Sequence, residues 1–267
     1  MTRHARHDPA APILETRGLC IRYDGRPALE DVSFALERGL RVAVVGPNGA
    51  GKSTLFKAVA GVLPVREGLV RICGSEPGRH LCIAYVPQRS EVDWTFPVSV
   101  FDTVLMGRTA DLGLFRRPRA RDRAFVRACL ETVGLAELAG RQIGELSGGQ
   151  QQRMFIARAL AQKAELMLLD EPAGGLDRTS QQELFRLLDG LAQRRVTVMI
   201  STHDLELAAR RFERVLLLNR RLIGFGTPEE VLTPERLAAA YAGNLRVVPA
   251  PDGTNVMHDP GCVEEHR

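Results

Sequence analysis

The chain contains 267 residues, of which 45% are hydrophobic and 25% are charged, and its formal net charge is +4. At ~150 residues per domain this length predicts about two domains, or one large domain with an inserted part. The composition excludes collagen-like, disulfide-scaffold and wholly disordered chains. The small excess of 36 basic over 32 acidic residues also argues against a dedicated nucleic-acid binder, in which cations are clustered and more numerous.

Neither a secretion signal nor a membrane-spanning segment is expected. The polar residues 1–12 have no apolar core of the kind that signal peptides carry. The longest apolar runs, such as Leu166–Leu169 and Val196–Ile200, are far shorter than the ~20 residues that a membrane helix needs. The five cysteines are widely spaced and form no CxxC pair, which predicts reduced core thiols in a cytoplasmic protein.

The first predicted elements are short strands with alternating apolar residues. They follow a flexible N-terminus at 1–12 and begin with Leu14–Tyr23 and Ala28–Leu36, which are separated by turn-forming residues. Val70–Cys73 and Ile83–Val86 continue the pattern. Because alternation of apolar and polar residues is typical of antiparallel sheets, these four runs predict a small antiparallel sheet attached to the rest of the fold.

Buried strands alternate with helices along the remaining chain. The apolar run Val42–Val45 is followed by a Gly-rich turn and then by a helical stretch from Lys52 to about Val62. Such alternation predicts a parallel sheet with helices on its faces. The further expected elements are helices at Gln150–Ala161 and Ser180–Arg194 and strands at Leu166–Leu169, Val196–Ile200, Val215–Leu218 and Leu222–Phe225.

A helical insertion is expected at about 89–161. Phe101–Met106 and Ala124–Val133 have apolar residues at helical spacing, and the cationic stretch Arg116–Arg123 lies between them. We interpret this stretch as a solvated loop and helix start, and contact with a membrane headgroup or a partner protein is the alternative.

The C-terminal residues, 246–267, are expected to form a flexible tail, because from Ala250 onward they are polar and contain Pro and Gly. His258, Cys262 and His266 are spaced by four residues, which would align three metal ligands on a helix. Pro260 and Gly261 would interrupt such a helix, so the spacing does not by itself predict a metal site.

The motif with the most specific chemistry is Gly46–Ser53, whose sequence GPNGAGKS fits the phosphate-binding pattern G-x4-G-K-[ST]. Its glycines allow backbone amides to surround phosphate oxygens at a helix N-terminus, where the helix dipole favours anions. We expect Lys52 to bridge the β- and γ-phosphates and the hydroxyl of Ser53 to coordinate magnesium. The motif therefore predicts a nucleoside triphosphate site.

Two carboxylates follow the predicted strand Leu166–Leu169. We expect Asp170 to hold the magnesium ion through a water molecule and Glu171 to polarise the water that attacks the γ-phosphate. Taken alone, the pair could be a helix-capping turn. Beside a phosphate-binding loop it predicts the catalytic half of a nucleotide site.

A second anion-binding helix end is expected at Leu146–Gln150, with the sequence LSGGQ. Ser147 is predicted to cap the helix, and the two glycines expose backbone amides. Since a chain needs one phosphate-binding loop for each nucleotide, the second site suggests that this turn covers the nucleotide of a partner subunit.

Together these motifs resemble those of the ATP-binding subunits of ABC transporters, in which LSGGQ is the signature. The resemblance covers about residues 13–245 and implies a single ABC ATPase domain of the α/β class. Its expected parts are a P-loop NTPase core with a parallel sheet, an attached antiparallel β subdomain and a helical signature subdomain at about 89–161. It also implies an ATPase that uses ATP with Mg²⁺.

Four further residues match family positions with defined roles. Tyr23 matches the aromatic residue that stacks on adenine, and Gln88 matches the loop glutamine that senses magnesium. Asp177 matches the loop that communicates between subunits, and His203 matches the switch histidine that contacts the γ-phosphate. The resemblance thus implies catalysis by Lys52, Gln88, Glu171 and His203, magnesium binding by Ser53, Gln88 and Asp170, and nucleotide contacts from Tyr23, Gly46, Pro47, Asn48, Gly49, Ala50, Gly51, Lys52, Ser53, Thr54, Ser147, Gly148, Gly149, Gln150 and Asp177.

The implied partners are a second copy of the chain in a head-to-tail dimer, integral membrane permease subunits and, indirectly, an extracytoplasmic solute-binding protein. The implied location is the cytoplasmic face of the cell membrane. A non-transport ABC ATPase is the alternative function class. The DNA-repair and chromosome members of that class carry a long coiled coil between the two motifs, whereas the segment between Thr54 and Ser147 has no heptad repeat.

The transported substrate is suggested by the segment Tyr85–Val98, which resembles the manganese, zinc and iron importer branch of the family. Val104–Arg108 and Phe115–Pro118 agree with that branch. Because this region lies where the motor contacts its membrane partner, it indicates the type of permease. The alternatives are iron–siderophore import and vitamin B12-type import.

Overall fold

The computed structural model describes residues 8, 10–76, 82–112, 117–193, 195–241, 246–249 and 255–258. The chain divides into two compact units. Among the described residues, the helical unit comprises those from 82 to 198, and the P-loop unit comprises those from 8 to 76 and those from 199 onward. Each unit is described below by itself.

The P-loop unit contains a three-stranded antiparallel sheet with the order β2-β1-β4. Its strands are β1 (Leu14–Tyr23), β2 (Arg26–Leu36) and β4 (Glu67–Ile72). Leu14 of β1 is paired with Leu36 of β2 and with Ile72 of β4. Burial alternates along β2, so the alternating pattern correctly predicts the sheet for these three strands.

The fourth run assigned to this sheet is placed elsewhere, and that prediction is wrong. Strand β5 (Ile83–Val86) pairs in parallel with β6 (Leu166–Asp170), with Val86 opposite Leu169. Three of its four residues are buried. A run of four mostly apolar residues is too short to show alternation, and its composition suits a strand that is covered on both faces.

Among the described residues, β5 and β6 pair in the helical unit, and the P-loop unit has the strand order β3-β8-β9. Every residue of β6 and β7 is buried, as expected for strands with both faces covered. Strand β8 is parallel to β3 and antiparallel to β9. The remaining strands are β3 (Arg41–Val45), β7 (Thr197–Thr202), β8 (Arg214–Asn219) and β9 (Arg221–Gly226). They confirm the strands predicted at Val42–Val45, Val196–Ile200, Val215–Leu218 and Leu222–Phe225.

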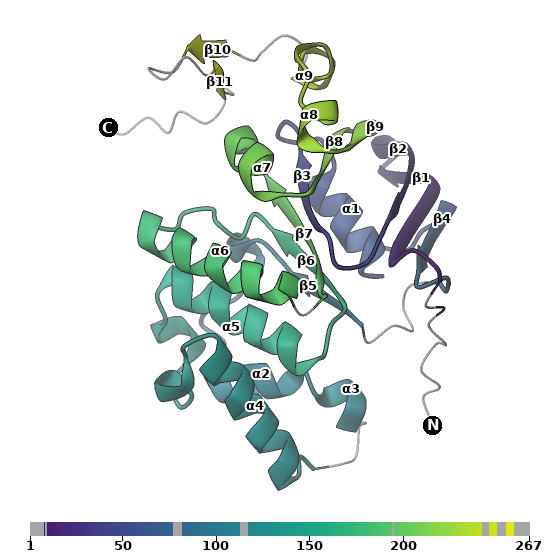
Figure 1. Cartoon of the computed structure of the whole chain (residues 1–267). Helices are drawn as coiled ribbons and strands as arrows, with labels where there is room; N and C mark the ends of the chain where they lie inside the picture. The colour runs from purple at the N-terminus through teal and green to yellow at the C-terminus, as the bar shows by residue number, and fades with distance from the viewer. Residues whose placement is uncertain are drawn as a thin grey trace. The chain divides into compact units, whose positions relative to one another are not determined.

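Helices α2 and α4 pack on α5 in the helical unit (Figure 1). Leu130 of α4 and Met154 and Ile156 of α5 are fully buried there. Helix α4 begins four residues before the predicted Ala124 because Asp122 bonds back to the Arg119 backbone and caps its first turn. The helices of this unit are α2 (Val100–Met106), α3 (Thr109–Leu112), α4 (Ala120–Thr132), α5 (Gly148–Ala161) and α6 (Arg178–Gln193), with 3-10 turns at Arg89–Glu91, Ala136–Leu138 and Ile143–Glu145.

The close approach of α2 and α5 depends on Gly107. A Cβ atom at this position would lie 2.4 Å from the carbonyl oxygen of Arg158. We expect Gly107→Ala to lower the free energy of unfolding by roughly 1–3 kcal/mol, which corresponds to a melting temperature about 2–12 °C lower. Thermal unfolding followed by circular dichroism measures this effect. Gly140→Ala is the matched control, because a Cβ there meets nothing within 4 Å, and an equal shift in both variants would contradict the packing argument.

The P-loop unit contains α1 (Lys52–Val59), α7 (Leu205–Arg211), α8 (Pro228–Val231) and α9 (Pro234–Tyr241). Helix α1 ends three residues before the predicted Val62, because Gly61 takes a φ of 72°.

Two short strands, β10 (Arg246–Pro249) and β11 (Asn255–His258), pair antiparallel in the segment for which a flexible tail is predicted. Cys262 and His266, the other members of the spaced tail set, lie outside the described residues, as does Arg116 of the cationic stretch. In the part of the chain that the structure describes, no helix has the length and apolar character needed to cross a membrane.

Candidate functional site

The candidate phosphate-binding loop joins β3 to α1 in the P-loop unit. Gly46 and Gly51 take φ angles of 154° and 96°. A Cβ on Gly46 would lie 2.0 Å from the carbonyl oxygen of Leu218, and one on Gly51 would lie 2.5 Å from that of Ala28. Both positions therefore require glycine on conformational and steric grounds. The tip of the loop, at Asn48 and Gly49, is exposed.

The Lys52 side chain is enclosed by this loop. Lys52 is only 6% exposed, and its Nζ donates hydrogen bonds to the carbonyl oxygens of Gly46 at 2.7 Å and Pro47 at 3.1 Å. The loop is closed by a bond from the Ala50 amide to the Pro47 carbonyl at 3.1 Å. The first turn of α1 then presents the partly buried Ser53 and Thr54. The arrangement places one cation among the amides of a helix N-terminus, which is a binding place for phosphate.

Tyr23 and His203 also belong to the P-loop unit. Tyr23 ends β1, is 46% exposed and adjoins a cavity of about 490 Å³ that Leu63 and Pro64 also line. Exposure of this size leaves the ring face available for stacking.

His203 is exposed and follows β7 directly. The next residue, Asp204, caps α7 by accepting a hydrogen bond from the Leu207 amide at 2.8 Å. Thr202 Oγ1 accepts one from the Asp204 amide at 3.1 Å. His203 is thus held between two anchored residues while its ring remains accessible.

The two carboxylates at the end of β6, Asp170 and Glu171, have different environments in the helical unit. Asp170 is 2% exposed, and the hydroxyl of Tyr85 donates to its Oδ2 at 3.5 Å. Glu171 is partly buried, has a φ of 45°, and its Oε2 accepts a hydrogen bond from Gln88 Nε2 at 3.1 Å. The parallel pairing of Val86 with Leu169 explains this contact, because Gln88 and Glu171 each lie two residues further along.

The signature residues form the start of α5. The Ser147 hydroxyl accepts from the Gln150 amide at 3.4 Å, and Gln150 Oε1 accepts from the Ser147 amide at 2.9 Å, which confirms the predicted cap as a reciprocal capping box. Gly149 is buried, and a Cβ there would lie 2.7 Å from the Ser180 hydroxyl of α6. The signature turn and the start of α6 are therefore in direct contact.

Asp177 caps α6. Its Oδ1 accepts from the Ser180 amide at 2.9 Å and its Oδ2 accepts from the Ser180 hydroxyl at 2.7 Å. These bonds, the backbone one first, lower the pKa of Asp177 below its ordinary value. These hydrogen bonds therefore favour the ionised form of the carboxylate beside the signature turn.

Three contacting residues were missed by the sequence reasoning. Tyr85 bonds Asp170, Ser180 lies against Gly149, and Arg89 donates from Nε to Gln151 Oε1 at 2.8 Å. Only Ser180 had a local signal, since an aspartate three residues before a serine is a helix-start pattern.

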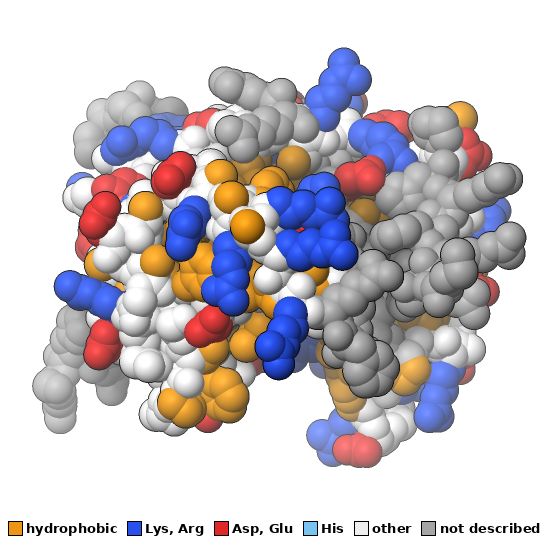
Figure 2. Space-filling view, turned by 90° about the horizontal axis from the view of Figure 1, so that it is seen from below, with side chains coloured by type: hydrophobic (Ala, Val, Ile, Leu, Met, Phe, Trp, Pro, Cys, Tyr) orange, Lys and Arg blue, Asp and Glu red, His pale blue; other side chains and the backbone are white. Residues whose placement is uncertain are grey.

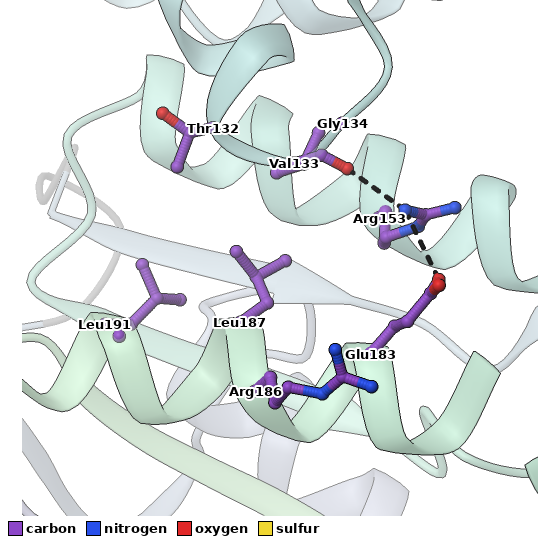
Figure 3. A pocket seen from close by; sticks show the side chains of 9 residues that line it. Thr132, Val133, Gly134, Arg153, Glu183, Arg186, Leu187 and Leu191 are labelled. Carbon is purple, nitrogen blue, oxygen red and sulfur yellow. Dashed lines mark hydrogen bonds and ion pairs between the residues drawn. The ribbon is translucent and has the colours of Figure 1, made fainter. Parts of the chain in front are cut away.

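A cavity of about 450 Å³ lies among the end of α4, the middle of α5 and α6 (Figure 3). Arg153 spans it and donates to the Val133 carbonyl at 3.4 Å, while its guanidinium pairs with Glu183 at 3.4 Å. None of the predicted site residues lines this cavity. The predicted residues instead divide between the two units, with Tyr23, the loop and His203 in one and Gln88, Asp170, Glu171, Ser147–Gln150 and Asp177 in the other.

Comparisons with known proteins agree with these features. The ABC transporter family model matches residues 29–174. The zinc transport system ATP-binding protein TroB of Treponema pallidum is 46% identical over 253 residues, which are 93% of this chain and 94% of that protein. The manganese transport system ATP-binding protein MntB of Halalkalibacterium halodurans is 44% identical, over 92% of this chain and 99% of that protein.

Solved structures show the same fold. An inward-facing ABC transporter assigned to the metal-chelate type is 32% identical with a TM-score of 0.77, over 92% of this chain and 95% of that chain. The predicted α/β class with a parallel core sheet, an antiparallel sheet and a helical part is therefore confirmed. The chain belongs to the ABC transporter family and is the ATP-binding, ATP-hydrolysing subunit of a transport system.

Proposed function

We propose that this chain is the motor that energises import of a divalent metal ion, manganese, zinc or iron, through a separate membrane permease. The single observation that carries this proposal is the identity of 44–46% with zinc and manganese transport ATPases over more than nine tenths of the chain. Residues 13–245 would act as one ABC ATPase domain. The ion itself would pass through the permease and would not contact this subunit.

The proposed ATP site uses the geometry of the phosphate-binding loop. Lys52 would exchange its bonds to the loop carbonyls for the β- and γ-phosphates, while the amides of Gly46–Thr54 surround the phosphate oxygens. Tyr23, at 46% exposure, would stack on adenine. Stacking of a base on an aromatic side chain is worth roughly 1–3 kcal/mol in single-strand nucleic-acid binders, and we expect a similar scale here.

A magnesium ion fits the donor set of Ser53, Gln88 and Asp170. Hydroxyl, amide and carboxylate oxygens are the hard ligands that Mg²⁺ prefers, and Asp170 is only 2% exposed. When bound, the ion neutralises charge on the β- and γ-phosphates. Asp170 would act through a water molecule and Ser53 and Gln88 directly.

Hydrolysis would depend on Glu171 and His203. The Glu171 carboxylate would accept a hydrogen bond, and then a proton, from the attacking water, and the His203 ring would align the γ-phosphate. In the structure, the bond from Gln88 Nε2 to Glu171 Oε2 holds the carboxylate in a defined direction, and it would be released when Gln88 turns to the magnesium ion. Positioning and charge stabilisation then supply most of the rate, as in other phosphoryl transfers.

Two copies of the chain would enclose the ATP in a head-to-tail dimer. The loop of one copy would hold the nucleotide, and Ser147, Gly148, Gly149 and Gln150 of the other would close over the γ-phosphate through their helix N-terminus. Asp177 is ionised and is linked to the signature turn through Ser180. Its loop would transmit conformational changes between the two copies. Loss of the γ-phosphate would remove the contact and reopen the dimer.

The proposed permease contact lies in the helical unit, at the cytoplasmic face of the membrane. Phe96 and Met106 are exposed to 57% and 49% and would supply apolar contacts to the permease. Figure 2, seen from the side of α4, shows Lys and Arg side chains gathered among hydrophobic ones. The exposed arginines of the helical unit near α4 are Arg117, Arg119, Arg121, Arg123 and Arg127. An extracytoplasmic solute-binding protein would deliver the ion to the permease.

Deletion of the gene tests the substrate. We expect the deletion strain to grow poorly in medium depleted of manganese, zinc or iron and to lose uptake of that ion, because the permease has no energy source. Expression of the native chain restores both, and Lys52→Met does not. Growth that is indifferent to all three metals but is impaired on siderophore iron or vitamin B12 would favour those substrates instead.

A further inference from the structure

We propose that Arg89 is a positioning residue that connects Gln88 to the signature turn of the same subunit. Through this connection, a change at one nucleotide site would move the glycines that close the partner's site. The inference rests on the head-to-tail dimer of the proposed function. All contacts that carry it lie within the helical unit.

The acceptor of the Arg89 guanidinium is itself held firmly. Arg89 Nε donates to Gln151 Oε1 at 2.8 Å, and Gln151 is only 3% exposed. Gln151 Nε2 donates in turn to the Ile143 carbonyl at 3.3 Å. With both ends of its amide engaged, Gln151 has one orientation, so a displacement of Arg89 acts directly on the first turns of α5. A charged donor also makes this bond stronger than a neutral one.

The guanidinium also lies against the signature backbone. A Cβ on Gly148 would lie 3.1 Å from Arg89 Nη1, 3.4 Å from Arg89 Cζ and 3.2 Å from Leu176 Cδ2. Gly148 is therefore enclosed by the loop after Gln88 and by the loop that carries Asp177. A shift of the first signature glycine toward either side chain would displace that side chain.

The backbone of Arg89 has an attachment to α5 as well. Trp94 Nε1 donates to the Arg89 carbonyl at 3.0 Å. The Trp94 ring contacts Phe155 of α5 edge-on, with ring centroids 5.7 Å apart. The Arg89 side chain thus contacts α5 directly, and its main chain contacts α5 through Trp94.

The proposed connection requires that Gln88 have two alternative partners, one without ATP and one with ATP bound. Its Nε2 donates to Glu171 at 3.1 Å in this structure, and the proposed function assigns its side chain to the magnesium ion when ATP is bound. The exchange of one partner for the other changes the direction of the loop at Gln88. Since Arg89 is the next residue, the change reaches Gly148 and Gln151 through one peptide unit, which is a physical basis for coupling.

Lysine cannot replace arginine in this arrangement. The planar guanidinium donates from Nε to Gln151 while its Nη1 lies beside Gly148. An ammonium group is a compact point charge on a flexible stem and cannot do both. Arg89→Lys is therefore expected to behave like Arg89→Ala. This comparison separates the geometry of the guanidinium from its positive charge.

The test measures ATP-dependent dimerisation of the full chain in the Glu171→Gln background by light scattering during gel filtration. We expect Arg89→Ala, Arg89→Lys and Gln151→Met each to raise the ATP concentration for half-maximal dimer formation roughly tenfold or more, the scale of one charge-assisted hydrogen bond. The double variant Arg89→Ala/Gln151→Met should match the single variants, because both act through one bond. Arg141→Ala, an exposed arginine of the same helical unit with no assigned role, should change nothing.

A merely structural role is excluded by two further readouts. Binding of trinitrophenyl-ATP to the monomer should change less than twofold in the Arg89 variants, and their melting temperatures should fall by no more than about 2–12 °C, the effect of losing one buried hydrogen bond. Unchanged dimerisation of Arg89→Ala, additive effects in the double variant, or a parallel loss of monomer nucleotide binding would each overturn the proposal. Failure of the Glu171→Gln parent itself to dimerise would instead overturn the head-to-tail dimer, and the Arg89 connection with it.

Discussion

Replacement of Glu171 by Gln is expected to abolish ATP turnover while ATP binding is retained. Gln keeps the shape of the side chain and can still accept a hydrogen bond from Gln88 Nε2, which lies 3.1 Å from Glu171 Oε2. It cannot take a proton from water at neutral pH. General base catalysis contributes about 10²–10⁴-fold, so steady-state phosphate release should fall by that factor.

The same variant should accumulate as a dimer in millimolar ATP, because the γ-phosphate that holds the two copies together is not removed. Light scattering should then report twice the 29.4 kDa of the monomer. Glu137→Gln is the matched control, since Glu137 is an exposed glutamate of the same helical unit with no assigned role. Near-normal phosphate release in Glu171→Gln would contradict the role given to this carboxylate.

Replacement of Lys52 by Met is expected to remove the high-affinity nucleotide site. The Lys52 ammonium is enclosed by the carbonyls of Gly46 and Pro47 and is 6% exposed, so its charge acts at a place where water screens it little. Loss of one charge-assisted hydrogen bond to phosphate costs about 1.5–3 kcal/mol. The dissociation constant for ATP, measured by calorimetry, should rise roughly 10- to 150-fold, and turnover should fall further.

Lys57→Met is the natural control, because Lys57 lies in the last turn of the same helix α1 and the chain has only one other lysine, Lys163. It should bind ATP like the native chain. Lys52→Arg should remain impaired although it keeps the positive charge, because a guanidinium fork does not fit between two loop carbonyls that accept from a single nitrogen. Native affinity in Lys52→Arg would mean that charge alone, without the enclosed geometry, is sufficient.

The features that could be predicted are those that a few neighbouring residues encode. The loop Gly46–Ser53 requires glycine where the backbone is left-handed or approaches another carbonyl, and both conditions hold at Gly46 and Gly51. Ser147 caps its own helix through Gln150, three residues away. Strands β3, β6, β7 and β8 are short apolar runs between polar turns. Each of these signals is contained in one segment of sequence.

Contacts between distant segments could not be predicted in this way. Arg89 and Gln151 are 62 residues apart in the chain, and Tyr85 and Asp170 are 85 apart. Nothing in either local sequence indicates the partner, because the partner depends on which strands are paired. The placement of Ile83–Val86 beside β6 rather than in the antiparallel sheet is the choice that brings Gln88 to Glu171.

The amino-acid sequence was therefore sufficient for the identity of the chemical groups: a phosphate-binding loop, a pair of carboxylates after a buried strand, and a capped helix start with two glycines. Local backbone conformation and hydrogen bonding between near neighbours determine such groups. The tertiary structure decided how the groups are held, through strand register, the bond between Gln88 and Glu171, and the enclosure of Gly148 by Arg89 and Leu176. These arrangements arise from packing between remote segments, for which the sequence carries no local pattern.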